Sequence, residues 1–157
     1  MSRKKRKLNI RPVLPDTKYN SIVISKFINK LMLDGKKRKA ENILYKSLSN
    51  LADKVNQEPL ESFLKVISIV SPNMEVKSRR VGGATYQVPT QVPKSRAITL
   101  AMRWIIANAR KRKSKSMVEK LTEEFVDAYN ETGASVKQKI DTHKMAEANK
   151  AFAHFRV

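Results

Sequence analysis

Hydrophobic residues recur at intervals of three and four positions along most of this chain, which is the period of one face of an α-helix. The clearest run comprises Ala40, Ile43, Leu44, Ser47, Leu48 and Leu51. Six segments carry such a pattern, and turn or breaker residues separate them. The pattern predicts six helices, at about residues 21–33, 40–53, 57–71, 95–111, 116–131 and 134–149.

The same spacing predicts which face of each helix is buried. The third predicted helix would bury Leu60, Phe63, Leu64 and Ile67. The sixth would bury Val136, Ile140 and His143. The single tryptophan, Trp104, is expected to anchor the core rather than to stack on a base.

Local signals also predict where several helices begin and end. Gly35 can take the left-handed C′ position after the first helix, and Pro59 suits the first turn of the third. Ser116 and Glu119 match a capping box at the start of the fifth helix. Gly133 separates the fifth helix from the sixth.

One stretch has a different period. Residues 74–77 and 85–88 alternate between apolar and polar side chains, which predicts two strands. Gly82 and Gly83 between them supply the positive φ angles of a tight hairpin turn, and Pro89 and Pro93 are expected to end the returning strand. A two-stranded ribbon is too small to be stable alone, so it must pack against a larger body.

These elements predict a mainly α protein, a six-helix bundle with a protruding two-stranded β-ribbon between helices three and four. We expect a disordered basic arm at residues 1–11 and a single helical domain at 12–157. Within that domain the ribbon would span about residues 73–90 and a C-terminal tail residues 150–157. The aromatic residues of the tail either pack back on the helices or contact RNA or a neighbouring protein.

Composition narrows the class of partner. The 157 residues include 33 Lys and Arg against 14 Asp and Glu, a formal net charge of +19, and no cysteine. Such a charge is normally tolerated because a polyanion neutralises it. No apolar run approaches the roughly 20 residues that span a bilayer, and the N-terminus lacks a signal-peptide core. The expected location is a reducing cytoplasm or an organelle interior.

The positive charge is unevenly distributed. Residues 72–115 hold eleven basic residues against the single acid Glu75, whereas residues 116–157 are almost neutral. The arm contributes Arg3, Lys4, Lys5, Arg6 and Lys7. Clusters at 36–39 and 110–115 add Lys36, Lys37, Arg38, Arg110, Lys111, Arg112, Lys113 and Lys115. We therefore expect the arm, the ribbon and the fourth helix to meet phosphates.

Catalysis finds little support in the sequence. The two histidines, His143 and His154, have no zinc-ligand spacing, and no cofactor motif is present. The acids of residues 119–131 occur at spacings typical of a solvated helix face, away from the basic segments. A nuclease needs carboxylates beside its phosphate-binding surface. The chain is interpreted as a binding protein, not an enzyme, without cofactor or metal.

Six ordered segments resemble a known family, the bacterial-type ribosomal protein seven of the small subunit. They are DGKK at 34–37, VKSRRVGG at 76–83, TYQVP at 85–89, AMRW at 101–104, ARKR at 109–112 and HKMAEANKAFAH at 143–154. The resemblance runs from about residue 14 to the C-terminus and implies six helices with a β-ribbon. It also implies direct binding to the 3′ major (head) domain of small-subunit rRNA, nucleation of head assembly, neighbouring ribosomal proteins of the head and platform, and a position beside the exit-site tRNA and mRNA.

By matching positions, the resemblance implies a set of rRNA contacts, namely Lys36, Lys37, Lys77, Arg79, Arg80, Arg96, Arg110, Lys111 and Arg112. The ribbon tip would approach the tRNA and mRNA through Arg80, Val81, Gly82 and Gly83.

Two other classes stay open from the residues alone. An architectural DNA-binding protein could insert a basic ribbon into a minor groove, although such proteins favour an apolar wedge at the tip. An RNA-processing enzyme would need acids from residues 119–131 at its active site.

Overall fold

The computed structural model describes residues 12–155, so the predictions for the arm at 1–11 lie outside it. The six expected helices form, with bounds within three residues of those expected. They are α1 (Ile22–Leu31), α2 (Lys37–Val55), α3 (Pro59–Val70), α4 (Lys94–Lys111), α5 (Met117–Tyr129) and α6 (Gly133–Ala148). Strands β1 (Met74–Val81) and β2 (Ala84–Gln91) lie between α3 and α4, and a short 3₁₀ helix, η1 (Lys150–Phe155), follows α6. The prediction of fold class is confirmed. No helix within the described residues is both long and apolar enough to span a bilayer.

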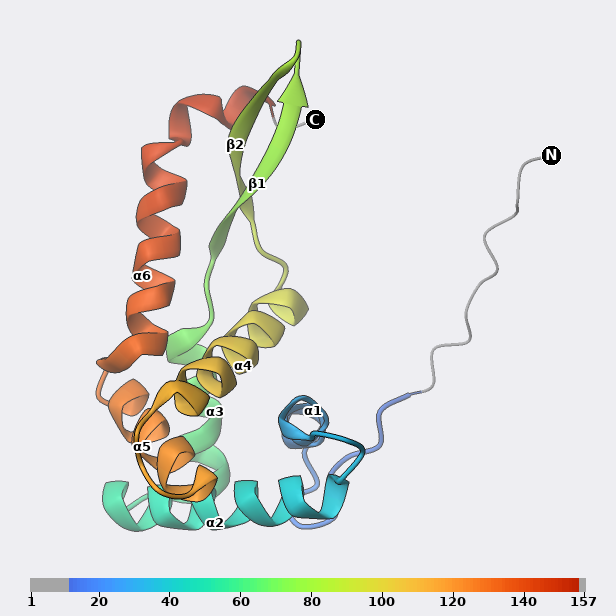
Figure 1. Cartoon of the computed structure of the whole chain (residues 1–157), viewed down its shortest axis with the longest axis vertical. Coiled ribbons are helices and arrows are strands. Elements are labelled where there is room, and N and C mark those ends of the chain that lie inside the picture. Colours follow the sequence, from blue (N-terminus) through green and yellow to red (C-terminus); the bar gives the residue numbers. More distant parts are fainter. Residues whose placement is uncertain (1–11, 156–157) are drawn as a thin grey trace, which may run out of the picture.

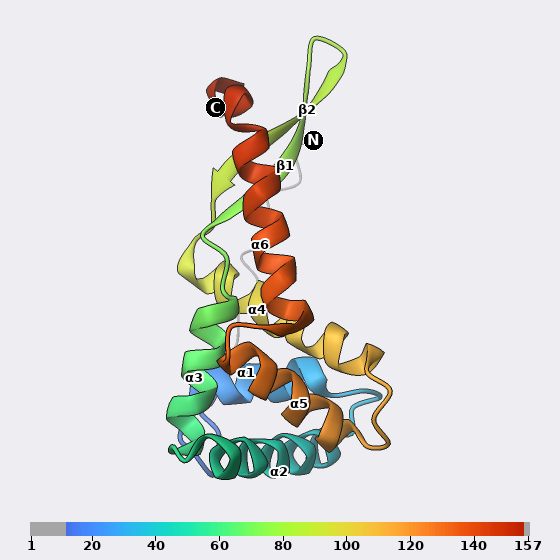
Figure 2. The same cartoon turned by 90° about the vertical axis from the view of Figure 1, so that its left-hand side faces the viewer.

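The molecule consists of a helical body and one long projection (Figure 1). Helices α1 to α5 form the body, with α2 lying across the end opposite the projection. The ribbon and α6 leave the body in the same direction and run beside each other, as the perpendicular view also shows (Figure 2). The ribbon therefore has the larger support that its size requires.

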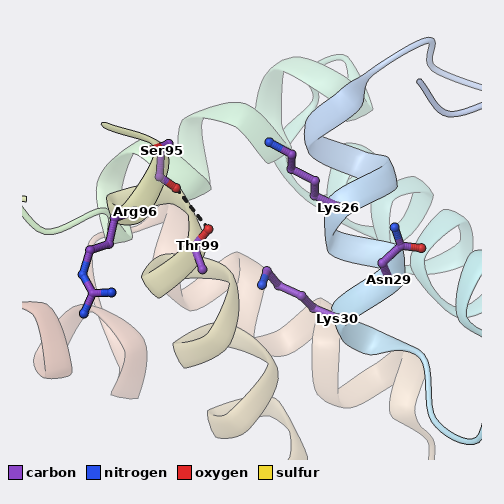
Figure 3. Close-up of a pocket in the computed structure, with 6 residues that line it drawn as sticks. All are labelled: Lys26, Asn29, Lys30, Ser95, Arg96 and Thr99. Carbon is purple, nitrogen blue, oxygen red and sulfur yellow. Dashed lines mark hydrogen bonds between the residues drawn. The ribbon is translucent and has the colours of Figure 1, made fainter. Parts of the chain in front are cut away.

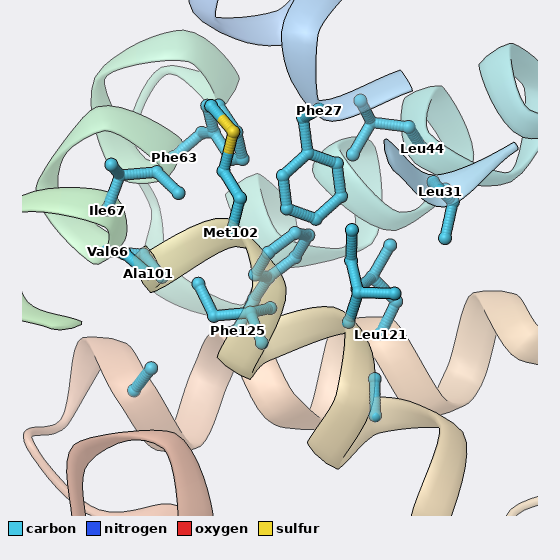
Figure 4. Packing of buried hydrophobic residues seen from close by; sticks show 14 of the residues in the cluster. Phe27, Leu31, Leu44, Phe63, Val66, Ile67, Ala101, Met102, Leu121 and Phe125 are labelled. Atoms are coloured by element: carbon cyan, nitrogen blue, oxygen red, sulfur yellow. The ribbon is translucent and has the colours of Figure 1, made fainter. Parts of the chain in front are cut away.

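Three phenylalanines from three helices form the centre of the core (Figure 4). Phe27 of α1, Phe63 of α3 and Phe125 of α5 are completely buried. Their ring centroids lie 5.4 to 5.8 Å apart, in edge-on and tilted arrangements that aromatic pairs favour. This cluster joins the first, third and fifth helices, which are distant in sequence, into one body.

The buried face of α3 differs from the expected one. Leu64 is 41% exposed, whereas Val66 and Val70 are fully buried. The helix is apolar on most of its circumference, so its pattern is compatible with more than one buried face. Packing of α2, α4 and α5 against α3 selects the face that contains Phe63, Val66 and Val70.

The predicted face of α6 is also wrong in part. Val136 is buried near the body, but Ile140 is 45% exposed. The helix extends past the body and has only the ribbon and η1 beside its outer part, so less of its apolar surface is covered.

The two strands are longer than expected, whereas the ribbon as a whole lies close to the expected residues 73–90. Its strands pair antiparallel from Met74 opposite Gln91 to Val81 opposite Ala84. Gly82 and Gly83 form the two-residue turn with φ angles of +56° and +90°, which confirms the role predicted for them. Pro89 lies inside β2 rather than ending it; each strand of a two-stranded sheet has an unpaired edge, where the missing N–H of proline is tolerated.

The C-terminal segment packs on the ribbon, which neither expectation for the tail had named. The ring of Phe152 in η1 lies 5.3 Å from the ring of Tyr86 in β2. The contact closes the projection into a unit of two strands, α6 and η1.

Candidate nucleic-acid interface

A row of cations lines the seam between α1 and α4. On α4, Arg96, Arg103 and Arg110 follow one another at intervals of seven residues, which keeps them near one face of the helix. On α1, Lys26 and Lys30 are four residues apart and face this row. An open hollow of about 660 Å³ between the two helices is lined by Lys26, Lys30 and Arg96, together with Asn29, Ser95 and Thr99 (Figure 3). The Arg96 guanidinium is turned away from α1.

Like charges are close enough along this seam to affect one another. The pKa of Lys30 is lowered by burial, and then by the positive charges of Arg103 and Lys26. The seam therefore holds cations at some cost in the unbound molecule. An anion placed between them would relieve that repulsion.

The cations at residues 36–39 lie at the start of α2, where their charge does not stabilise the helix. Lys37, Arg38 and Lys39 form the first turn of α2, which contains no acid. The positive end of the helix dipole disfavours cations there. Two exposed ion pairs, Lys36 with Asp34 at 3.6 Å and Lys37 with Glu41 at 3.8 Å, offset little of this. This placement favours a phosphate-binding role over a merely solvated face.

Gly35 adopts a positive φ of +71°, as expected, but not at the expected place. Helix α1 already ends at Leu31, so Gly35 lies in the loop before α2 and not at the C′ position.

Glu75 joins the base of the ribbon to α4. Its carboxylate is buried and accepts hydrogen bonds from Arg96 Nε at 2.8 and 2.9 Å. Lys77 lies 3.5 Å from the same carboxylate. The pKa of Glu75 is lowered, mainly by the hydrogen bond from Arg96. Arg96 is thus held at the junction of ribbon and body while 48% of its side chain stays exposed.

The Arg112 side chain is largely buried and pairs with acids of α5. Its guanidinium donates to Glu124 at 2.8 Å from Nε, contacts Glu123 at 3.5 Å and pairs with Asp127. Although burial disfavours its charge, hydrogen bonds to Asp127 and Glu124 raise the pKa of Arg112 overall. These pairs place Arg112 at the junction of α4 with α5, and we expect it not to act as the phosphate contact that its sequence suggested.

The acids of α5 also differ from expectation. They were interpreted as a solvated face, but Glu124 is only 1% exposed. It accepts hydrogen bonds from Arg112 and from the backbone N–H of Ser135 at 3.1 Å. The interpretation is wrong for Glu124, because the arginine that it binds comes from outside its own helix.

Successive side chains around the α4–α5 loop alternate between the interior and the solvent. Arg112 and Ser114 point inward, and Ser114 donates to Glu123 at 2.7 Å. Lys111, Lys113 and Lys115 are exposed. The inward contacts therefore present three lysines on the outer side of the loop. The expected capping box at Ser116 and Glu119 forms directly after it and is confirmed.

The remaining predicted contacts lie on the ribbon. Lys77, Arg79 and Arg80 are exposed along β1, inside the strand rather than in the turn. The tip residues Val81, Gly82 and Gly83 are exposed as well. They lie at the end of the projection, far from the seam (Figure 1).

Lys26, Lys30 and Arg103 were not among the residues selected from sequence. The spacing of four on α1 and of seven on α4 was present as a signal. Only the packing of α1 against α4 brings the two helices' cations together.

His143 has a structural contact. Its Nε2 accepts a hydrogen bond from the backbone N–H of Asn73 at 3.0 Å, at the start of the ribbon. Within residues 12–155, no cluster of three or more histidines and acids is arranged to hold a metal ion.

Comparison with known proteins identifies the family. The family model described as Ribosomal protein S7p/S5e matches residues 2–150. The chain belongs to the ribosomal protein S7p/S5e family. This family is structural and not enzymatic, and RNA binding is part of its role, which confirms both the resemblance and the interpretation as a binding protein.

Individual relatives match over nearly the whole chain. The Small ribosomal subunit protein uS7 of Desulfosudis oleivorans is 56% identical over 153 residues, 98% of each chain. The proteins of that name from Petrotoga mobilis and Lawsonia intracellularis are 56% and 57% identical over 146 residues, 93% of this chain and 94% of theirs.

Proposed function

We propose that this chain is a structural constituent of the small ribosomal subunit that binds the 3′ major (head) domain of small-subunit rRNA directly and nucleates assembly of the head. Its partners would then include neighbouring ribosomal proteins of the head and platform. The family and the names of its relatives support the ribosomal role. The bacterial sources of those relatives favour a ribosome in a bacterial cytoplasm, with an organelle interior as the other location.

The observation that carries direct rRNA binding is the cationic seam between α1 and α4. Its lysines and arginines come from two helices and lie close together, and the pKa of Lys30 is lowered first by burial and then by the charges of Arg103 and Lys26. Neutralising phosphates there releases counterions and relieves repulsion within the protein. The exposed lysines of the α4–α5 loop and the first turn of α2 supply further contacts. Patches set on different helices select an RNA by its shape.

Titration of a head-domain rRNA fragment at several salt concentrations tests this proposal. Replacing Lys26 and Lys30 with Gln should reduce the slope of log affinity against log salt by about two, because each lost phosphate contact removes about 0.9 from it. The matched control replaces Lys46 and Lys54, two exposed lysines of α2 away from the seam. Equal slopes for the two double variants would contradict a role for the seam.

We also propose that the ribbon tip lies near the exit-site tRNA and mRNA. The tip is cationic through Arg80 and reaches farthest from the body. Arg80→Ala should leave stability within about 0.5 kcal/mol, because the side chain is exposed. Subunits assembled with this variant should retain exit-site tRNA less well. Normal tRNA retention would remove the ribbon tip from the proposal.

Duplex DNA as a competitor distinguishes the architectural alternative. The tip residue Val81 is only 40% exposed and is followed by two glycines, which makes it a weak wedge. Duplex DNA should therefore displace head-domain rRNA poorly. Equal affinity for both would contradict the ribosomal proposal and favour the DNA-binding one.

A further inference from the structure

Four helix ends meet around a second hollow, of about 410 Å³. It lies between the end of α1, the start of α2, the end of α4 and the start of α5. Its volume falls within the range of roughly 300–1,000 Å³ found for small-ligand sites.

The floor of this hollow is apolar. Leu31 and Ala40 are buried beneath it, and Ile43 and Met117 are partly covered. Leu33 at its edge is 60% exposed, an unusual position for a leucine in a short polar loop. Apolar surface left open here would be stabilised by an apolar or aromatic group that covers it.

The rim is cationic. Lys36, Lys39 and Arg110 line the opening, with Asp34 as the one acid among the lining residues. Arg110 is held in place by a hydrogen bond from its guanidinium to the carbonyl of Leu31 at 3.2 Å. Arg110 also ends the row of arginines on α4, so the hollow continues the cationic seam.

An apolar floor with a cationic rim fits one chemical class better than others. The base of an unpaired nucleotide has two apolar faces, and its phosphates are anionic. An apolar side chain of a protein would use the floor but leave Lys39 and Arg110 without a counter-charge, since Asp34 already pairs with Lys36. A duplex would use the cations but could not reach the floor.

We infer that this hollow receives the base of an unpaired nucleotide of the bound RNA, with Lys39 and Arg110 on its phosphates. This inference rests on the proposed function and specifies the kind of RNA structure recognised. The seam binds backbone without regard to pairing, and the hollow selects RNA that presents an extruded base at the right distance.

Two substitutions make the apolar lining more polar without changing charge, Leu33→Asn at the edge and Met117→Gln in the floor. Together they should weaken binding to a head-domain rRNA fragment by about ten-fold, the scale of losing one base contact. The salt slope should not change, because no phosphate contact is removed. A third variant, Met117→Trp, fills the hollow and should have the same effect. The matched control is Leu64→Asn, another exposed leucine, on α3 and outside the hollow.

Chemical modification of unpaired bases locates the nucleotide. The wild-type protein and the Leu64→Asn control should protect at least one unpaired base that the Met117→Trp variant leaves reactive. A duplex RNA without unpaired nucleotides should bind the wild type and all variants equally.

The outcomes separate the two proposals. Suppose that the wild type prefers head-domain rRNA and that the floor variants keep its affinity and its protections. The inference about the hollow is then wrong, and the proposed function stands. Suppose instead that a floor variant weakens binding to the duplex as strongly as binding to head-domain rRNA. That result refutes the inference about the hollow, because the loss of affinity does not depend on an unpaired base. Normal rRNA binding with loss of a neighbouring protein from assembled subunits would assign the hollow to a protein side chain and refute the nucleotide. Absence of any rRNA preference in the wild type refutes the proposed function and this inference with it.

Discussion

Individual cations of this chain look alike in sequence but have different physical roles. Within ARKR at 109–112 and the following lysines, Arg112 pairs with three carboxylates, Arg110 donates to a carbonyl at the end of α1, and Lys111 and Lys113 face solvent. A count of charges identified the segment correctly as basic. It could not distinguish these roles, because each depends on residues that are distant in sequence.

Arg112→Ala should destabilise the protein by about 3 kcal/mol or more, because it leaves the buried Glu124 without its cation. The 23% exposure of Arg112 places the expected loss near the lower end for a broken buried pair. Lys113→Ala is the matched control and should change stability by less than about 0.5 kcal/mol. Urea unfolding measures both.

The salt dependence of rRNA binding gives a second, independent readout for the same two variants. Lys113→Ala should lower the slope by about one, whereas folded Arg112→Ala should keep the wild-type slope. The opposite result, a stable Arg112→Ala protein with a lower slope, would return Arg112 to the set of phosphate contacts.

At the scale of elements, the helix ends determine where the binding groups lie. The loop between α5 and α6 is short and covers residues 130–132. Gly133 has a φ of +86°, and a Cβ built on it would lie 2.9 Å from the Cβ of Asp127. Asp127 is also one of the acids that bind Arg112. Gly133 therefore adds to the link between α6 and the α4–α5 loop that Glu124 makes through Ser135 and Arg112.

Gly133→Ala should destabilise the protein by about 2–4 kcal/mol, from the strained φ and the displaced Asp127. Gly35→Ala is the matched control: its φ is +71°, and nothing lies within 4 Å of its added Cβ. It should lose only about 1 kcal/mol, the cost of the left-handed conformation. Equal losses in urea unfolding would show that the contact with Asp127 is relieved without cost.

At the scale of the whole molecule, the projection is attached to the body by the packing of α6 on α3, α4 and α5 and by several polar contacts. Lys139 of α6 donates to the carbonyl of Ile69 at 2.6 Å, at the end of α3. His143, one turn further, accepts from the N–H of Asn73 at the start of β1. Glu75 and Arg96 fasten the ribbon to α4. These contacts set the direction of the ribbon relative to the seam.

The attachment at His143 should depend on pH. Burial, and then the charge of Lys139, lower the pKa of His143 below its ordinary value of 6.5. A group with a lowered pKa in the folded state binds fewer protons there than in the unfolded state, so stability rises with pH. The contribution is complete above the unfolded pKa and is lost as pH falls through the folded one. Protonation also removes the acceptor for Asn73.

His143→Gln keeps an acceptor but does not titrate. Between pH 7.5 and 5, the wild type should lose about 1 kcal/mol more than His143→Gln, the size of one hydrogen bond. Urea unfolding at each pH measures the difference, and His154 is common to both proteins. Parallel pH profiles would show that protonation of His143 does not weaken the attachment.

The sequence by itself determined the elements and the class of partner. Helical period, the Gly82–Gly83 turn and the capping box are local signals, because the interactions that produce them lie within a few residues. Net charge needs no fold to be evaluated, and the resemblance to a ribosomal family used six short segments in order.

Only the tertiary structure decided which charges face outward and which surfaces combine. The seam needs α1 packed against α4, the network of Arg112 needs α5 beside the α4–α5 loop, and the second hollow needs four helix ends. The buried face of α3 and the open side of α6 were likewise set by neighbours. Burial and pairing depend on atoms brought together from distant segments, and a one-dimensional pattern does not contain those distances.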